Sequence, residues 1–381
     1  GAARHRQRHA EAVDRTTTWP LMANYRPFDV VIVGAGPAGL ALGTLLRPEQ
    51  RVLVLERRAS LARTPPIGES LPGAAAVLLQ RLNLMAAFRD AGHRERGAAV
   101  SVWDDDKPVW RDAIQDPAGP GWYLDRREFE QMLRLRAQDV GVTLGEGCKQ
   151  VDIRHRQGQW YLDTTLGSFR APVMIDATGR SGYLGRQLGL RRDADDPLLC
   201  LYSFLDQAAE SQDATMRIQA DARGWWYTVP LPQGQRVLAY HMDVDDPLCR
   251  QLLRHPDAFL ARAREHALLA EVLERVAPAR VRGRPAGTSL LEVGQLPKAG
   301  PGFLAIGDAL LAFDPLASQG LFHSLASATS AAKAIESGLH QSLGAYQQEM
   351  QAVSQRYLFH LKASYQGPRR FSQEAFWQRR Q

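Results

Sequence analysis

The stretch Asp29-Val-Val-Ile-Val-Gly34-Ala-Gly36-Pro-Ala-Gly39 decides the fold of this chain. Its first five residues are mainly apolar and β-branched, which is typical of a strand buried on both faces of a parallel sheet. The continuation is a G-x-G-x-x-G motif: the first glycine makes a tight turn, the second lets the backbone approach a pyrophosphate, and the third lets a helix pack on the strand. Residues 40–46 continue as that helix, whose N-terminus would hold the phosphates.

An acidic residue closes this unit at the expected distance. Residues 51–55 predict the second strand, and Glu56 follows at its tip, about twenty residues after the first glycine, where a carboxylate accepts a ribose hydroxyl. A glycine motif alone occurs by chance in loops, but here a strand precedes it, a helix follows it and an acid lies at the right distance. A purely structural glycine turn is the weaker interpretation, although the unit alone does not distinguish NAD from FAD.

The composition is that of a soluble globular protein of two domains, with 381 residues of which 45% are hydrophobic. No apolar run approaches the about 18 residues of a membrane span, so we expect no contact with a membrane. Cys148, Cys200 and Cys249 lack C-x-x-C spacing, which argues against disulfides and zinc and for a reducing, cytoplasmic location. Three acids at 104–106 favour a solvated hairpin turn over a metal site, so no metal is expected.

The formal net charge of +6 lies at the two ends of the chain. Residues 1–26 and residues 367–381 each carry a net charge of +3, which leaves residues 27–366 neutral. Arginine-rich ends are more often solvated tails than binding arms, so we expect a flexible basic tail at 1–26 and no nucleic-acid partner. A basic arm for an acidic protein or RNA stays open as the alternative.

The rest of the chain alternates between this nucleotide-binding pattern and a second, aromatic one. Helical spacing is found at residues 73–91, 126–140, 257–276, 320–340 and 342–365. Three short strands between 150 and 170 and a buried strand at 171–176 lead to Ala177-Thr-Gly179, and a buried strand at 302–306 leads to Gly307-Asp308. Residues 198–241 contain aromatic, period-two segments that predict a second sheet.

The order of these elements predicts an α/β fold. A discontinuous Rossmann-like domain would be interrupted by a substrate domain built on a mainly antiparallel β-sheet and followed by C-terminal helices. The predicted ranges are 27–95, 126–195 and 295–340 for the nucleotide-binding domain, 96–125 and 196–294 for the substrate-binding sheet domain, and 341–381 for the C-terminal helical segment and basic tail.

Three motifs, the glycine triplet at 34–39, Ala177-Thr-Gly179 and Gly307-Asp308, occur in the order of a known family. The chain resembles the FAD-dependent monooxygenases built like p-hydroxybenzoate hydroxylase, which implies noncovalent FAD in a domain of the GR2 type. No second G-x-G-x-x-G exists, so NAD(P)H or a separate flavin reductase would deliver electrons without a domain of its own. The cofactor-binding residues that the resemblance implies are Gly34, Gly36, Ala38, Gly39, Glu56, Arg57, Ser70, Arg126, Asp308, Pro315, Ser318, Gly320 and Leu321.

Two stretches resemble the branch of this family that contains flavin-dependent halogenases. Residues 313–320 match the halogenase pattern F-x-x-P-x-x-S-x-G, and residues 225–230 are a degenerate W-x-W-x-I-P. Residues 67–72 likewise resemble the halogenase loop beside the flavin. Two halogenase groups are missing, because residues 73–79 contain no lysine to capture hypohalous acid and Ala317 stands where the halogenases have a glutamate.

The resemblance therefore implies oxygenation instead of halogenation. We expect an FAD-dependent monooxygenase that uses O2, through a flavin C4a-hydroperoxide, to hydroxylate an electron-rich aromatic substrate. That substrate would be an indole, a tryptophan, a phenol or a tryptophan within a partner protein, as in the maturation flavoproteins of quinone-cofactor enzymes, which residues 376–380 also resemble. The alternatives are an FAD-dependent reductase of alkenes, a halogenase, and a flavin-bearing scaffold for an assembly partner.

Four residues are the catalytic candidates. Trp225 and Tyr227 suit an apolar wall around the substrate, although aromatic residues of a sheet are most often core. His323, like His241, could shuttle a proton near neutral pH, although a lone histidine is usually structural. Glu69 could polarise the flavin edge, or it could belong to a helix N-cap.

Overall fold

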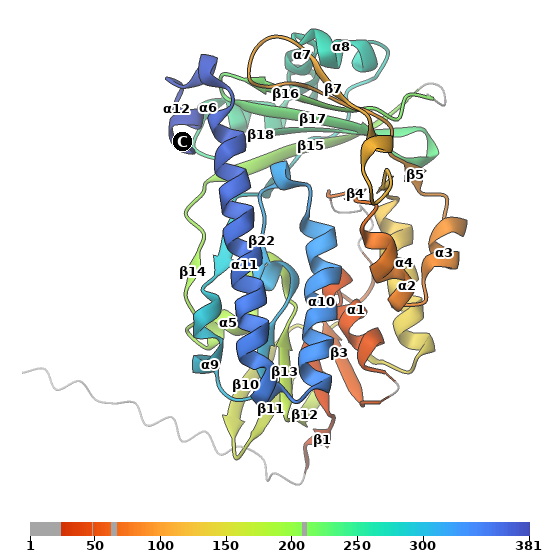
Figure 1. Ribbon diagram of the computed structural model, residues 1–381, viewed down its shortest axis with the longest axis vertical. Helices are drawn as coiled ribbons and strands as arrows, with labels where there is room; N and C mark the ends of the chain where they lie inside the picture. The colour runs from red at the N-terminus through yellow and green to blue at the C-terminus, as the bar shows by residue number, and fades with distance from the viewer. Residues whose placement is uncertain (1–23, 48, 62–66, 208–211) are drawn as a thin grey trace, which may run out of the picture.

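The computed structural model describes residues 24–47, 49–61, 67–207 and 212–381 (Figure 1). The basic tail expected at residues 1–26 lies outside the described residues up to residue 23. A five-stranded sheet occupies the lower half of the view in Figure 1, and a seven-stranded sheet lies at its top. This arrangement confirms the predicted α/β fold, in which a nucleotide-binding unit is joined to a second sheet.

The five-stranded sheet is parallel, with the strand order β21-β13-β2-β3-β9. Its strands are β2 (Val30–Val33), β3 (Val52–Glu56), β9 (Thr143–Glu146), β13 (Val173–Asp176) and β21 (Phe303–Ala305). All four residues of β2 are buried, as its apolar run predicts. Because neighbouring strands come from distant parts of the chain, this unit is discontinuous.

Helix α1 (Pro37–Leu46) packs against β3 and against two other helices, α4 (Arg126–Asp139) and α10 (Gly320–Glu336). The single helix predicted at 73–91 is instead two helices, α2 (Ala75–Arg81) and α3 (Met85–Asp90). The helix is interrupted at Asn83, because its φ of 56° is left-handed and cannot continue a right-handed helix. That conformation cannot be recognised from the apolar spacing, which is helical on both sides of the break.

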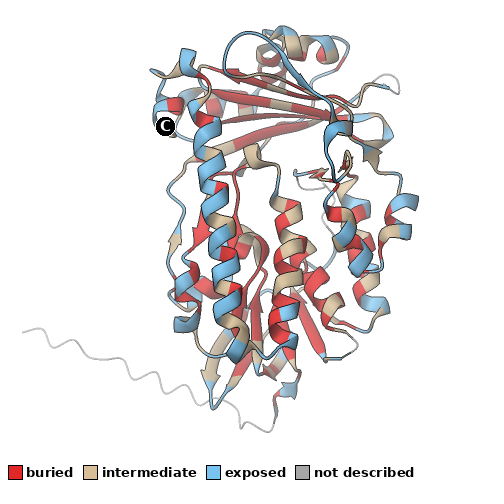
Figure 2. Cartoon of the chain, in the orientation of Figure 1, coloured by how far each residue is buried: buried red, intermediate tan, exposed pale blue. Residues whose placement is uncertain are grey.

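The seven-stranded sheet has the order β19-β15-β18-β17-β16-β6-β7, and every pair except β16 with β6 is antiparallel. Its strands are β6 (Ala99–Val102), β7 (Val109–Arg111), β15 (Leu198–Asp206), β16 (Met216–Asp221), β17 (Gly224–Pro230), β18 (Gln235–Asp243) and β19 (Arg282–Pro285). The central strands β15, β17 and β18 are almost wholly buried (Figure 2). The hairpin turn predicted at 104–106 joins β6 to β7 and is exposed.

Three helices cover one face of this sheet. They are α6 (Pro247–Arg254), α7 (Pro256–Arg264) and α8 (Ala267–Leu273), so the single helix predicted at 257–276 is divided. Trp226 and Tyr240 of the sheet are stacked with ring centroids 4.0 Å apart, and Phe259 of α7 packs on Trp226. The opposite face of the sheet is directed at the nucleotide-binding unit.

Three smaller sheets and two short helices complete the connections. The sheets are β1 (Arg26–Pro27) with β12 (Gly167–Ala171), β11 (Gln159–Thr164) and β10 (Val151–Arg156); β14 (Arg192–Asp193) with β20 (Ser289–Leu291) and β22 (Leu311–Ala312); and β4 (Ser70–Leu71) with β8 (Trp122–Tyr123) and β5 (Arg94–Glu95). The helices are α5 (Tyr183–Gln187) and α9 (Leu296–Ala299). The three-stranded meander predicted between 150 and 170 is confirmed.

A long helix, α11 (Leu339–Gln366), extends from the five-stranded sheet to the seven-stranded sheet (Figure 1). Near its start, Tyr346 Oη donates to the backbone oxygen of Ala305 in β21 (2.8 Å). Near its end, the backbone oxygen of Ser364 accepts from Trp103 Nε1 (2.8 Å). The helix therefore connects the two halves of the molecule.

The segment after α11 packs on the sheet, so its interpretation as a solvated basic tail is wrong. In α12 (Ala375–Gln378), Trp377 is 0% exposed and its Nε1 donates to the backbone oxygen of Asp221 (2.8 Å). Arg380 lies 2.5 Å from a carboxylate oxygen of Asp196 and 2.6 Å from one of Asp243. A buried aromatic ring and a neutralised arginine thus anchor the end of the chain.

We expect Trp377→Ala to lower the free energy of unfolding by about 3–5 kcal/mol, the usual cost of truncating a fully buried tryptophan. Urea unfolding followed by circular dichroism measures this loss. The matched control is Trp110→Ala on β7, since that side chain is 59% exposed and its loss should change stability by no more than about 0.5 kcal/mol. Equal effects of the two substitutions would show that the C-terminal segment is not packed as described.

Candidate cofactor and active site

Three glycine turns that are far apart in sequence meet at the carboxyl ends of the parallel strands. A Cβ added to Gly34 would lie 2.1 Å from the backbone oxygen of Ala177, which follows β13. A Cβ on Gly307, which follows β21, would lie 2.9 Å from Cβ of Ala38 in α1. Only glycine permits these approaches. The motifs at 34–39, 177–179 and 307–308 therefore form one site.

Two helix N-termini at this site begin beside open space. A Cβ added to Gly36, just before α1, or to Gly320, at the start of α10, would meet no atom within 4 Å. Free backbone N–H groups and the positive helix end bind anions and carbonyl oxygens at such positions. The turns thus leave room for a pyrophosphate at the start of α1 and for a carbonyl oxygen of the same ligand at the start of α10.

Glu56 lies beside the first glycine turn at the end of β3. Its carboxylate accepts from the backbone N–H of Ala35 (2.9 Å) and from that of Arg58 (3.0 Å). This position suits a carboxylate that accepts a ribose hydroxyl. The side chain of Arg57 is exposed, and its predicted role in cofactor binding stays a prediction.

Arg180 and Arg192 hold the turn around Asp308, and neither was predicted from the sequence. Arg180 donates to the backbone oxygen of Phe313 (2.7 Å), and its Nε lies 3.9 Å from the Asp308 carboxylate. Arg192 donates to the backbone oxygens of Asp308 and Ala309, each at 2.5 Å. Burial raises the pKa of Asp308, and the charge of Arg180 opposes this effect. The one feature of the sequence that could have indicated Arg180 is its position directly after Ala177-Thr-Gly179.

Two predicted cofactor residues present buried polar atoms without a partner in the described part of the chain. Arg126 donates through its Nη atoms to the backbone oxygen of Gly68 (2.5 Å) and to Glu130 (2.6 Å), while its Nε has no acceptor. The hydroxyl of Ser70 is likewise buried and unpaired. Buried polar groups are normally hydrogen-bonded, so these two atoms fit a polar ligand that runs past residues 68–70.

The turn at residues 313–320 contains three further predicted residues, and a fourth, Leu321, follows it in α10. Pro315 begins a short 3₁₀ turn that ends at Ala317, and Ser318 follows with a left-handed φ of 51°. Gly320 and Leu321 then begin the helix. With the glycine turns, the helix N-termini and the unpaired donors, these residues fit FAD.

Glu69 and Tyr227 meet between residues 67–71 and the face of the seven-stranded sheet that is directed at the nucleotide-binding unit. Glu69 is 3% exposed and accepts hydrogen bonds from the hydroxyl of Tyr227 and from the backbone N–H of Gly68 (2.9 Å). Burial raises the pKa of Glu69, and these two donors oppose the effect. Tyr227 belongs to the same hydrophobic cluster as the partly buried side chains of Ile67, Phe204, Ile218 and Leu316. Together with Glu69, these side chains form an apolar junction that contains a buried carboxylate.

The other three catalytic or shuttle candidates, Trp225, His241 and His323, are all buried. Trp225 is 1% exposed, stacks on His241 with ring centroids 3.7 Å apart and packs on the C-terminal segment. Burial lowers the pKa of His241 to about 3 and that of His323 to about 4. Both rings are therefore uncharged near neutral pH, which argues against a shuttle of protons by either one.

Amines and metal ligands are not features of this junction. The sequence contains five lysines, and all are exposed: Lys107, Lys149, Lys298, Lys333 and Lys362. Among the described residues, no three His, Cys, Asp or Glu side chains are close enough to hold a metal ion. The junction therefore offers a carboxylate and a phenol that are hydrogen-bonded to each other.

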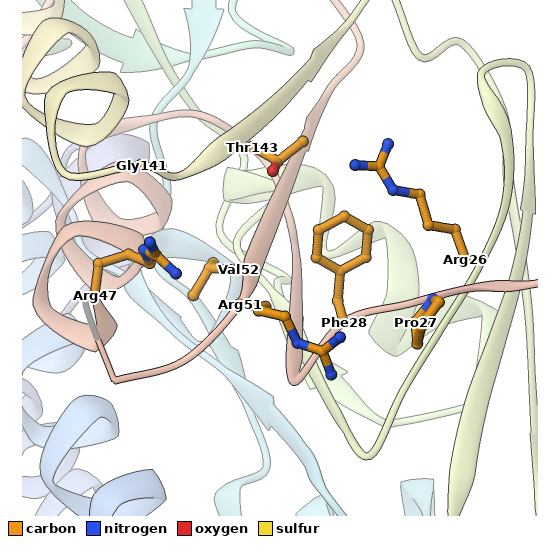
Figure 3. A pocket seen from close by; sticks show the side chains of 8 residues that line it. All are labelled: Arg26, Pro27, Phe28, Arg47, Arg51, Val52, Gly141 and Thr143. Carbon is orange, nitrogen blue, oxygen red and sulfur yellow. The ribbon is translucent and has the colours of Figure 1, made fainter.

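A pocket of about 330 Å³ lies at the opposite end of the parallel strands (Figure 3). Phe28, Val52 and Thr143, at the amino ends of β2, β3 and β9, line it together with three arginines. One of these, Arg51, is paired with the carboxylate of Asp29 at 3.0 Å. Ligands of parallel α/β sheets bind at the carboxyl ends of the strands, so this surface pocket is separate from the candidate site.

Comparison with known sequences identifies a family and a full-length relative. The family model of the FAD binding domain matches residues 27–359. The chain is 27% identical over 366 residues to LodB of Marinomonas mediterranea, which is named an FAD-dependent oxidoreductase, and the match covers 93% of this chain and 96% of LodB.

Two solved structures share the fold. CmlS, a flavin-dependent halogenase, superposes with a TM-score of 0.78 at 22% identity over 93% of this chain and 68% of CmlS. QhpG, a peptidyl tryptophan dihydroxylase essential for tryptophylquinone cofactor biogenesis, does so with a TM-score of 0.69 at 24% identity over 93% of this chain and 78% of QhpG. None of the helices in the described residues is both long and apolar enough to span a membrane.

Proposed function

Since this chain belongs to the FAD-binding domain family and is a flavin-dependent oxidoreductase, we propose that it hydroxylates an electron-rich aromatic ring, and that this ring is a tryptophan side chain of a partner protein. The full-length similarity to LodB supports an oxidoreductase of the same overall construction. The shared fold with QhpG, a peptidyl tryptophan dihydroxylase, supports the choice of a protein-bound tryptophan.

One observation carries this proposal: the apolar junction contains the Glu69–Tyr227 pair, and every lysine of the chain is exposed. Halogenases use a lysine near the flavin loop to capture hypohalous acid, as the resemblance implies. Residues 73–79 lie in and before α2 and contain none. A carboxylate without an amine suits a reaction in which the ring gains oxygen and loses a proton.

The residues of the junction have separable roles in this reaction. FAD, reduced by NAD(P)H or by a flavin reductase, would supply the activated oxygen from O2. Ile67, Phe204 and Ile218 would exclude water and hold the flat ring. The Glu69 carboxylate would accept the proton that the ring carbon loses once oxygen is attached. Tyr227 would orient that carboxylate through the hydrogen bond it already donates.

A turnover assay with ¹⁸O2 and excess bromide tests the proposal. We expect tryptophan in a peptide or protein to gain labelled oxygen, read by mass spectrometry, with little product from free tryptophan. The electron source is NAD(P)H or photoreduced flavin, so a missing reductase does not mask the reaction. Bromine incorporation without labelled oxygen would establish a halogenase, and flavin oxidation without any product would leave the alkene reductase and the scaffold.

A further inference from the structure

Buried hydrogen bonds join α11 to the turn at residues 313–320. Tyr365 Oη donates to Asp314 Oδ2 (2.6 Å), and Asp314 Oδ1 accepts from the backbone N–H of Leu316 (2.8 Å). Asp314 and Tyr365 are each 1% exposed. The Asp314 carboxylate thus caps the short 3₁₀ turn that begins at Pro315 and is itself held from α11.

A second tyrosine of α11 holds the backbone of the same residue. Tyr357 Oη accepts from the backbone N–H of Asp314 (2.7 Å), and its ring stacks on Phe313 with centroids 4.2 Å apart. Tyr357 and Tyr365 are eight residues apart, so they lie on one face of the helix. The long helix α11 therefore contacts both residues that precede the 3₁₀ turn, Phe313 and Asp314.

The hydroxyl of Tyr365 also contacts the seven-stranded sheet. Trp225 Nε1 donates to Tyr365 Oη (3.2 Å), and the Arg380 guanidinium lies 5.6 Å from the centre of the Tyr365 ring. Removing this one oxygen would break the hydrogen-bonded link from Asp314 through Tyr365 to Trp225 of the sheet while leaving the aromatic packing in place.

We infer that Tyr365 is a positioning residue for the bound flavin: its hydroxyl fixes the side chain of Asp314 and, through it, the 313–320 turn at the start of α10. The inference rests on FAD binding at this turn and does not depend on which reaction follows. It adds α11, a helix outside the glycine turns, to the elements that shape the FAD site, because α11 sets the charge and the position of Asp314 in the turn.

The charge of Asp314 makes this role measurable. Burial raises the pKa of Asp314 to about 6, while the bonds from Tyr365 and from the Leu316 N–H oppose the rise. Of the more distant charges, Asp196 raises this pKa and Arg380 lowers it. Because Tyr365 donates to the charged form, its loss must raise the pKa further, so the carboxylate then takes up a proton at a higher pH.

The experiment follows the visible absorption and fluorescence of bound FAD against pH in the flavin-loaded protein. The wild type should show an inflection near pH 6, where Asp314 titrates. In Tyr365→Phe the inflection should move up by about one to two pH units, the equivalent of one hydrogen bond to a charged acceptor. The matched control is Tyr346→Phe, which removes a buried hydroxyl of the same helix that bonds Ala305 instead and should keep the wild-type inflection.

An inflection at the same pH in Tyr365→Phe and in the wild type would overturn the inference. Asp314→Asn provides the second variant: it cannot titrate, so the inflection must disappear, and its persistence would equally overturn the inference. No substrate is present in these measurements. A chain that fails to hydroxylate tryptophan can therefore still show the shift, and a chain without the shift can still hydroxylate.

Discussion

Glu69→Gln should keep its FAD and lose most of its product formation. The amide fills the same space and can still accept the hydrogen bond from Tyr227, but it cannot take up the proton that the ring loses. General base catalysis contributes about 10²- to 10⁴-fold in enzymes, and we expect a decrease in this range in the rate of labelled product formation. Oxygen uptake should continue, since the flavin contacts are unchanged, and hydrogen peroxide should replace product.

The pH dependence of product formation provides a second test of this role of Glu69. Burial raises the pKa of Glu69, so a base at this position is protonated, and inactive, at a higher pH than an ordinary glutamate. The wild-type rate of product formation should fall as the pH drops through that raised pKa, and this acid limb should be absent from the residual rate of Glu69→Gln.

A matched control is available on the other face of the same sheet. Asp221 is also a buried carboxylate that accepts from a tyrosine, with Tyr240 Oη at 2.8 Å, but it lies beside Arg262 of α7 and His266, on the face that the helices cover. Asp221→Asn should cost stability and leave turnover per bound flavin close to that of the wild type. If both substitutions slow product formation equally, Glu69 has no direct role.

Gly36→Val should give a folded protein without flavin. The φ of Gly36 is −77°, which any residue can adopt, and its Cβ would meet nothing in the protein. The valine side chain would instead occupy the space in front of α1, where the pyrophosphate approaches. Losing two charge-assisted hydrogen bonds of about 1.5–3 kcal/mol each corresponds to about 10²- to 10⁴-fold weaker binding. The ratio of absorbance at 450 nm to that at 280 nm after reconstitution measures the loss.

Two other glycines make the interpretation of this result specific. Gly294→Val also adds a side chain in open space, away from the glycine turns, and should bind FAD normally. The φ of Gly34 is 115°, and a valine at this position would place its Cβ 2.1 Å from the backbone oxygen of Ala177. The Gly34→Val protein should therefore unfold more easily than the wild type, even without flavin. Normal flavin content in Gly36→Val would place the pyrophosphate elsewhere.

The parts of the site that could be predicted are those set by local spacing. Gly34, Gly36 and Gly39 follow a buried strand at fixed intervals, and Glu56 ends the next strand, so their meeting follows from the strand–helix–strand geometry alone. The turn at 313–320 was recognised differently, through its resemblance to the halogenase pattern, whose proline, serine and glycine lie within one short segment.

The parts that could not be predicted depend on contacts between distant segments. Glu69 and Tyr227 were separate candidates, and nothing in either segment indicates that the two side chains would bond across 158 residues. Arg180 and Arg192 bind backbone oxygens, which every residue possesses and no sequence pattern records. The C-terminal arginines were counted as free charge because their acidic partners lie far away in the sequence.

The discontinuous five-stranded sheet also determines when FAD can be captured during synthesis. β21 and Gly307, which complete the sheet and the site, are made roughly 270 residues after β2 and Gly34. At about 5–20 residues per second, that interval lasts roughly 14–54 s. Throughout it the apolar strands of the nascent chain lack their last neighbour, and unpaired strand edges of this kind favour aggregation. We therefore expect the complete flavin site to form only after β21 and Gly307 have been synthesised.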